Sequence, residues 1–170
     1  MNVDYYHGIP KVYFTSIISN IIKIGNLNRT NKTILDFGCG SKILSKMLKN
    51  QKILNYDLDP RYTEHDDYSK LNFDIVVFNH VLMYINEKEI LSIFENIKKI
   101  NKECGFIIGI NKEGFINKLA ALLALKFDAH KDTKSSYKKQ LSLINSEMRI
   151  IDVKKNIFFM TDVFYTKFNT

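Results

Sequence analysis

Apolar residues recur along this chain in two rhythms, which predict helices alternating with strands. Helical spacing runs through Pro10–Ile24 and Lys42–Lys49. A further helix begins after Asn86, where Glu89 three residues on completes a capping box. The same spacing predicts helices at 115–127 and, capped by Ser135, as far as Ile144, with a loop at 128–134 between them.

Shorter apolar segments between these helices predict seven strands. Apolar runs at 33–35, 74–79 and 106–110 are typical of strands buried on both faces of a parallel sheet. Residues 52–57 form a plausible short strand of mixed polarity. We expect one further short strand near 62–67, and residues 148–153 and 158–168 alternate like an antiparallel pair. The pattern predicts a single α/β domain over residues 1–170, with a Rossmann-like, doubly wound and mostly parallel seven-stranded sheet that ends in an antiparallel C-terminal pair.

The turn after the first strand carries the most specific chemistry. Asp36 stands at the end of that strand and is followed by Gly38, Gly40 and Ser41 before the next helix. Strand, glycine turn and helix are the start of a nucleotide-binding βαβ unit, because glycines let the backbone approach a ligand closely. A dinucleotide fingerprint would need glycine where Ile43 stands, and a P-loop would need Gly-Lys-Ser/Thr. Both of these sites are therefore excluded.

The acidic residue followed by G-x-G resembles the first motif of the class I S-adenosylmethionine-dependent methyltransferases, roughly D/E-x-G-x-G-x-G. Lys42 takes the third glycine position, and Cys39 lies within the loop. Residues 73–84 resemble the fourth motif of that family, with Met83 and Tyr84 in place of the usual Glu and His; the matching residues are Phe73, Asp74, Val76, Val81 and Leu82. Residues 104–110 resemble the family's entry to its fifth strand.

The resemblance implies S-adenosylmethionine as cofactor and S-adenosylhomocysteine as product. Gly38, Cys39 and Gly40 would pass beneath the methionine portion, with Asp36 supporting that loop or reaching the amino group of the cofactor through water. Asp57, 21 residues after Asp36, would accept hydrogen bonds from the ribose hydroxyls. An ordinary loop aspartate before the turn at Asp59-Pro60 is the alternative reading of Asp57. The remaining residues expected at the cofactor are Leu58, Asp67, Tyr68 and Asn79.

The acceptor should lie beside the cofactor, where inserted segments cover the ends of the strands. We expect residues 1–30 to form an N-terminal helical cap and 111–147 a substrate-side insert. His80, directly after the fourth strand, is the candidate general base. An ordinary packed histidine is the competing interpretation. The residues expected to line the acceptor pocket are Tyr5, Tyr6, Tyr84 and His130, although the two N-terminal tyrosines could equally belong to a frayed terminus.

Composition limits the partners that come into question. The formal net charge is +7, and the lysines are scattered along the sequence, which makes nucleic acid a minor possibility. Two cysteines without metal-ligand spacing predict neither a disulfide scaffold nor a metal site. No signal peptide or transmembrane segment is visible, so we expect a cytoplasmic protein.

Missing motifs narrow the acceptor. The stretch after the fourth strand lacks the Asp/Asn-Pro-Pro-Tyr of adenine amino-methylating enzymes, and the chain has no Pro-Cys nucleophile for cytosine carbon methylation. We therefore expect in-line methyl transfer to a small-molecule, sugar or lipid-linked acceptor. Two alternatives stay open: a non-catalytic relative that keeps the fold as a cofactor-binding or scaffold module, and an RNA methyltransferase, which the net charge would suit.

Overall fold

The computed structural model describes residues 9–112, 134–156 and 160–169. Its centre is one mixed sheet whose strands lie in the order β2-β1-β3-β4-β6-β5. The strands are β1 (Ile34–Phe37), β2 (Ile53–Tyr56), β3 (Ile75–Asn79), β4 (Gly105–Asn111), β5 (Met148–Lys155) and β6 (Thr161–Phe168). The first four run parallel, and β6 lies antiparallel between β4 and β5. The described residues thus form the predicted α/β architecture.

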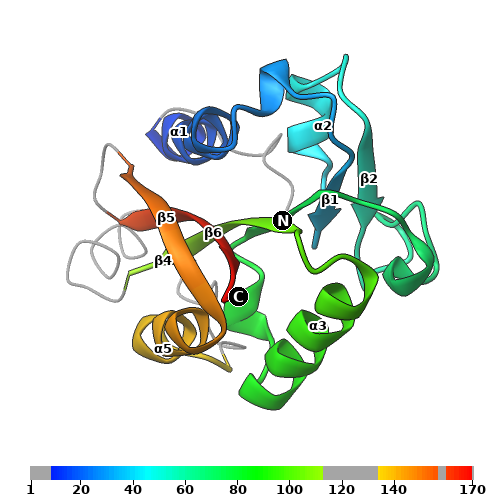
Figure 1. Cartoon of the computed structure of the whole chain (residues 1–170). Helices are drawn as coiled ribbons and strands as arrows, with labels where there is room; N and C mark the ends of the chain where they lie inside the picture. Colours follow the sequence, from blue (N-terminus) through cyan, green and yellow to red (C-terminus); the bar gives the residue numbers. More distant parts are fainter. Residues whose placement is uncertain (1–8, 113–133, 157–159, 170) are drawn as a thin grey trace.

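Helices cover both faces of this sheet (Figure 1). One face carries α1 (Ile9–Ile24) and the short α2 (Ile43–Met47), and the other carries α3 (Glu87–Ile100) and α5 (Tyr137–Glu147). Within the described ranges, three 3-10 turns connect the larger elements: η2 (Leu27–Arg29), η3 (Tyr68–Lys70) and η4 (Leu82–Tyr84). No helix among the described residues is long and apolar enough to cross a membrane.

Strands β1, β3 and β4 are buried on both faces, which explains their uninterrupted apolar sequences. Successive side chains of a strand point to opposite faces, so alternate residues enter different cores. Val76 and Phe78 pack beneath α3, whereas Ile75 and Val77 pack beneath α1. Asn86 caps α3 through the predicted capping box, with its side chain accepting from the Glu89 backbone nitrogen at 3.0 Å.

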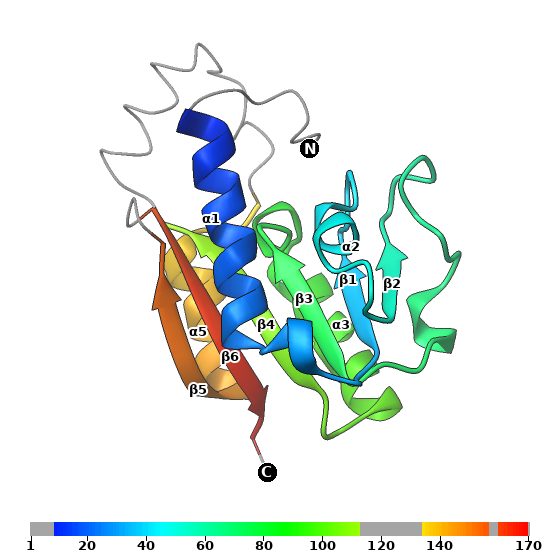
Figure 2. The same ribbon diagram turned by 90° about the horizontal axis from the view of Figure 1, so that it is seen from above.

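The parallel strands give the sheet two chemically different edges. We call the edge where β1–β4 end the carboxyl edge, and the edge where they begin the amino edge; β6 runs the opposite way and begins at the carboxyl edge (Figure 2). The chain passes from β1 outward to β2 and then returns to β3 on the other side of β1. Ligands of open α/β sheets bind at the carboxyl edge beside such a switch point.

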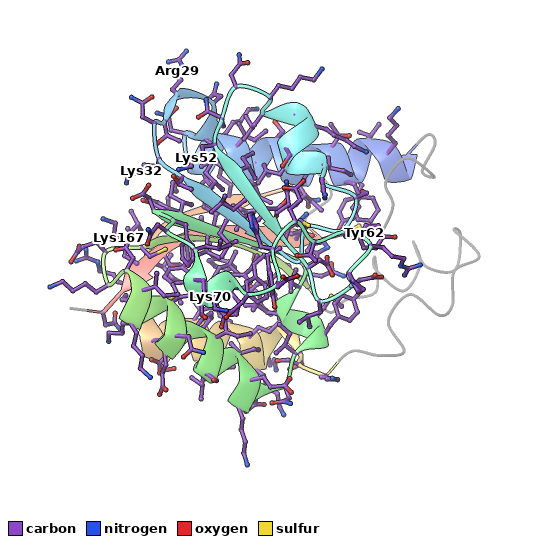
Figure 3. The ribbon with its side chains drawn as sticks, turned by 90° about the vertical axis from the view of Figure 1, so that its right-hand side faces the viewer. Arg29, Lys32, Lys52, Tyr62, Lys70 and Lys167 are labelled. Carbon is purple, nitrogen blue, oxygen red and sulfur yellow. The ribbon has the colours of Figure 1, made fainter. Side chains whose placement is uncertain are left out.

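Labelled side chains mark the two edges in Figure 3. Lys32 and Lys167 lie on one side of the molecule, at the amino edge, and Tyr62 lies on the opposite side, near the glycine turn. Tyr62 belongs to the loop after β2, whose backbone contacts the glycine turn through Cys39. The carboxyl edge therefore brings together the loops that follow β1 and β2.

Several sequence predictions are corrected by the structure. The described residues contain six strands, not seven. The segment 62–67 forms turns and bends, because its polar residues bond locally: the Thr63 hydroxyl donates to the His65 carbonyl at 2.7 Å. Ser136, not Ser135, caps α5 by accepting from Lys139. Asp36 lies inside β1 rather than after it. The predicted helix at 115–127 and most of the loop that follows it lie outside the described residues.

Candidate functional site

Every second residue of the turn after β1 has a left-handed backbone conformation, as the spacing of its glycines predicts. Gly38, Gly40 and Lys42 have φ values of 75°, 47° and 56°. At Gly38 the conformation coincides with a close approach, because a Cβ there would lie 2.3 Å from a methyl carbon of Val81, which follows β3. Any larger residue would force the two loops at the switch point apart, so this position requires glycine on both grounds.

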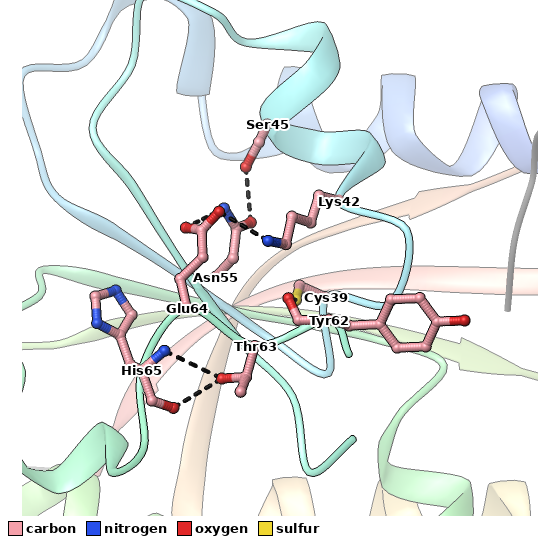
Figure 4. A network of polar contacts seen from close by, with 8 residues as sticks. All are labelled: Cys39, Lys42, Ser45, Asn55, Tyr62, Thr63, Glu64 and His65. Carbon is pink, nitrogen blue, oxygen red and sulfur yellow. Dashed lines mark hydrogen bonds and ion pairs between the residues drawn. The ribbon is translucent and has the colours of Figure 1, made fainter. Parts of the chain in front are cut away.

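Lys42 adopts a left-handed conformation that glycine takes without strain, and its side chain reaches a neighbouring loop. Its ammonium lies 2.8 Å from Glu64 Oε1. Glu64 Oε2 also accepts from Asn55 Nδ2 at 2.9 Å, and Asn55 Oδ1 accepts from the Ser45 hydroxyl at 2.7 Å (Figure 4). This network of four side chains joins α2, β2 and the following loop. The substitution therefore leaves the glycine turn in its expected shape.

Asp57 is built into the glycine turn. One carboxylate oxygen accepts from the Gly40 backbone nitrogen at 2.9 Å, and the other accepts from the Asp59 nitrogen at 3.0 Å. Two backbone bonds to the end of β2 hold the turn from the other side, since the nitrogens of Gly38 and Cys39 both donate to the Tyr56 carbonyl. Each carboxylate oxygen has a second lone pair, so Asp57 can still accept from a ligand hydroxyl.

Asp36 is almost fully enclosed, with 5% of its surface exposed. It stands in β1 between Asn55 of β2 and Val77 of β3. Burial, and secondarily the charge of Asp57, raises the pKa of Asp36 to about 7. The Cys39 thiol beside it is also pushed toward its neutral form, because burial and the same two carboxylates raise its pKa to about 12. Cys39 is therefore unsuited to act as a nucleophile.

Three of the residues expected at the cofactor, Leu58, Asp67 and Tyr68, occupy the loop between β2 and η3 and the start of η3. Leu58 has an exposed side chain, at 79%. Asp67 caps η3 by accepting from the Ser69 nitrogen at 2.9 Å, a bond that helps hold its pKa below the ordinary value. The centroid of the Tyr68 ring lies 5.1 Å from that of Phe37 and 5.3 Å from that of Tyr56. Tyr68 thus anchors this loop to the core.

Asn79 and His80 end β3 at the switch point. The side-chain oxygen of Asn79 is buried and has no hydrogen-bond partner among the described residues. His80 has a φ of 58°, and its backbone nitrogen donates to the Gly109 carbonyl at 3.0 Å. Its ring Nε2 lies 3.1 Å from the Thr161 hydroxyl, which lies 2.7 Å from the Tyr13 hydroxyl. A left-handed histidine costs about 1 kcal/mol, and strain of this kind gathers at functional sites.

A second polar group beside His80 was missed by sequence reasoning. Asp162, at the start of β6, is buried and accepts from the Tyr137 hydroxyl at 2.9 Å. The Lys112 ammonium lies 2.8 Å from its other oxygen, as an ion pair without hydrogen-bond geometry. Because β6 runs antiparallel, its first residues share the carboxyl edge with the last residues of β4. Only the strand order, which pairs Asn111 with Thr161, could have placed these residues together.

Of the residues expected to line the acceptor pocket, the structure describes one. Tyr84 ends η4 and has 41% of its surface exposed. Tyr5, Tyr6 and His130 lie outside the described residues. Among the residues that the structure describes, no cluster of three or more histidine, cysteine, aspartate or glutamate side chains is arranged to hold a metal ion.

Comparisons with known proteins agree with this geometry. The family model described as a methyltransferase domain matches residues 11–144, most of the chain. Among curated proteins, none matches the sequence significantly.

Solved structures share the fold at low sequence identity. Magnesium protoporphyrin IX methyltransferase (ChlM) from Synechocystis PCC 6803, with bound SAH, is 10% identical with a TM-score of 0.58 over 96% of this chain and 89% of that one. N-methyltransferase NodS from Bradyrhizobium japonicum WM9, in complex with S-adenosyl-L-homocysteine, is 10% identical with a TM-score of 0.67 over 93% and 88%.

The small RNA methyltransferase HEN1 is a third structural neighbour, 14% identical with a TM-score of 0.69; the match covers 96% of this chain but 26% of that one. Identities this low show a shared fold alone. The family model, the glycine turn and the strand order together show that this chain belongs to the class I S-adenosylmethionine-dependent methyltransferases.

Proposed function

We propose that the carboxyl edge binds S-adenosylmethionine through the glycine turn, Asp57 and Asn79, and that the methyl group passes to a small-molecule acceptor. Sugars and lipid-linked intermediates are included in that class. The observation that carries the proposal is the buried Asn79 oxygen, which lacks a partner among the described residues. A buried acceptor without a donor costs about 1–3 kcal/mol, and a bound ligand with amine or hydroxyl donors would remove that cost.

The residues at this edge suit the proposed cofactor. Asp57 has lone pairs left for ribose hydroxyls, and the glycine turn permits close approach of the methionine portion. The exposed Leu58 side chain offers an apolar surface for the adenine ring next to Asp57. In the proposal, Asp67 and Tyr68 complete the adenine contacts, and Asp36 and Cys39 support the turn from below.

Bound at this edge, S-adenosylmethionine would supply a methyl group already activated on a sulfonium. The protein then has to align the acceptor and remove its proton. We propose that His80 removes this proton. Its ring Nε2 lies 3.1 Å from the Thr161 hydroxyl, which holds the ring in place. The Tyr13 hydroxyl keeps its proton because burial raises its pKa, and it lies in hydrogen-bond contact with the Thr161 hydroxyl at 2.7 Å. Thr161 and Tyr13 are positioning residues, and Tyr84, Tyr5, Tyr6 and His130 are proposed to line the acceptor.

Calorimetric titration with S-adenosylmethionine tests the cofactor assignment. Removal of Asp57 by alanine should weaken binding roughly 10- to 100-fold, because hydrogen bonds to a charged group are each worth about 1.5–3 kcal/mol. Asp59→Ala is the matched control, since the Asp59 carboxylate faces solvent and pairs with Arg61. Unchanged affinity in Asp57→Ala would show that the ribose assignment is wrong. Circular dichroism on both variants checks the fold.

The acceptor class can be tested with S-adenosylmethionine labelled in its methyl group. The purified enzyme is incubated with fractionated cell extract, and the label is followed into small molecules, lipid-linked material, RNA and protein. We expect the label in the first two fractions, and it should disappear when His80 is replaced by alanine. Label recovered in RNA instead would overturn the small-molecule assignment and favour the RNA alternative.

A further inference from the structure

Lysines and arginines that are far apart in the sequence gather along the amino edge. The aligned positions there are Arg149, Lys167, Gly105, Ile75, Ile34 and Ile53, one from each strand in spatial order. Lys52 directly precedes Ile53, and Lys32 and Lys102 lie in the turns that lead into β1 and β4. Figure 3 shows Arg29, from η2, on the same side as Lys32 and Lys52. We call these six residues the basal cation row: Arg29, Lys32, Lys52, Lys102, Arg149 and Lys167.

The basal cation row is not neutralised within the protein. None of its six members forms an ion pair with a described residue. Five cations outside the row do: Lys42 with Glu64, Arg61 with Asp59, Lys70 with Asp67, Lys112 with Asp162 and Lys139 with Glu87. Three carboxylates occur in the same turns and strand starts, at Asp74, Glu103 and Glu147, against seven cations, which are the six of the row and Lys49. The Asp74 carboxylate already accepts a hydrogen bond from the Thr33 backbone nitrogen at 2.8 Å.

Two members of the row even oppose each other. Arg149 and Lys167 are direct cross-strand partners in β5 and β6. Like charges at opposed positions destabilise a sheet, typically by a few tenths of a kcal/mol. An anion bound between them would turn that repulsion into attraction.

The surroundings of the row favour a phosphate polymer over a lipid surface. The exposed residues of the turns at 28–32, 49–52 and 101–103 are all polar or charged, including Asn28, Asn31 and Asn50. Amide and ammonium donors of this kind contact phosphate oxygens, whereas attachment to a membrane usually adds apolar side chains that insert. The exposed large apolar residues of the described chain lie outside these turns. The row also has no exposed ring on which a base could stack.

We propose that the basal cation row is a docking surface for the phosphate backbone of a nucleic acid, separate from the methyl-transfer site. Neighbouring strands are about 4.8 Å apart, so the row extends roughly 24 Å across the six strands. That length spans about seven phosphates of one duplex strand, of which we expect the row to contact about four. It lies at the opposite end of β1–β4 from the glycine turn. The polymer held there positions the enzyme on a nucleic acid without presenting a base to the cofactor.

Fluorescence anisotropy with a labelled 20-base-pair duplex, as DNA and as RNA, tests this proposal over a series of salt concentrations. For the wild type we expect a slope of log K against log salt of about −4, from about four contacts. The triple variant Lys32→Gln, Lys52→Gln, Lys167→Gln should lose about 3 units of that slope. The matched control is the triple variant Lys11→Gln, Lys88→Gln, Lys138→Gln, which removes the same charge from exposed helical positions. This control should keep most of the salt slope of the wild type.

The outcomes separate this proposal from its alternatives. If the row variant and the control lost equal amounts of the salt slope, net charge alone would drive binding, and the proposal would be overturned. No salt-dependent binding by the wild type would do the same. Binding to phosphatidylserine vesicles without binding to either duplex would assign the row to a membrane surface. Calorimetry with S-adenosylmethionine on each variant checks that the fold and cofactor site are intact, so failure here is distinguishable from failure of the proposed function.

Discussion

Replacement of Asp36 by asparagine should stabilise the protein at pH 8 and leave its stability near pH 4 almost unchanged. Burial in β1 raises the pKa of Asp36 from 3.8 to about 7, and the charge of Asp57 contributes in the same direction. The unfolded chain releases this proton near pH 3.8. Between these two values the folded state binds more protons than the unfolded state, so stability falls as the pH rises through this window.

The magnitude follows from the width of the window. One pH unit corresponds to about 1.4 kcal/mol, so a folded pKa of about 7 implies a penalty of about 4 kcal/mol at pH 8. Asparagine has nearly the same shape and carries no charge. We expect Asp36→Asn to recover roughly 2–4 kcal/mol at pH 8, the lower figure allowing for relaxation around the buried charge.

Urea denaturation followed by circular dichroism, at intervals from pH 4 to pH 8, measures this difference. The other titrating groups are common to both proteins, so they largely cancel in the comparison. Asp59→Asn serves as the control, because Asp59 faces solvent and its bonds to Arg61 hold its pKa at about 2. Its effect should stay constant above pH 4. A constant difference between Asp36→Asn and the wild type from pH 5 to pH 8 would refute the burial argument.

Three further predictions concern single elements of the structure. Lys42→Ala should be about 1 kcal/mol less stable in urea than Lys42→Gly, because both lose the Glu64 ion pair but only alanine keeps the left-handed strain; equal stabilities would count against that strain. Asn86→Ala should lower stability by about 1 kcal/mol through loss of the α3 cap, and an unchanged urea midpoint would contradict it. Thr161→Val should shift the pH profile of kcat without changing cofactor affinity, since Thr161 contacts the His80 ring; an unshifted profile would remove its positioning role.

The local elements followed from the sequence wherever residues near in the chain decide them. Apolar runs predicted β1, β3 and β4, and the capping box at Asn86 predicted the start of α3. The glycine spacing predicted the turn after β1, because left-handed backbone at Gly38 and Gly40 is a local property. The expected strand at 62–67 failed for a related reason, since the side chains of Thr63 and Asp67 bond the nearby backbone of His65 and Ser69.

Contacts between distant residues could not be predicted in this way. The sequence marked Lys42 as a departure from the glycine motif, but only the position of Glu64 in the loop after β2 decided where its side chain goes. The contacts around His80 join residues that are far apart in the chain. His80 and Thr161 are 81 residues apart, and Tyr13 and Thr161 are 148 residues apart. The insertion of β6 between β4 and β5 brings them together.

The sequence by itself determined the rhythm of strands and helices, the glycine turn and hence the methyltransferase family. The tertiary structure decided which charges act together. Lysines that look scattered in the sequence form one row because parallel strands all begin at the same edge and antiparallel β6 ends there. Register fixes that alignment through backbone hydrogen bonds between strands, and side-chain sequence alone does not specify which strands will be neighbours.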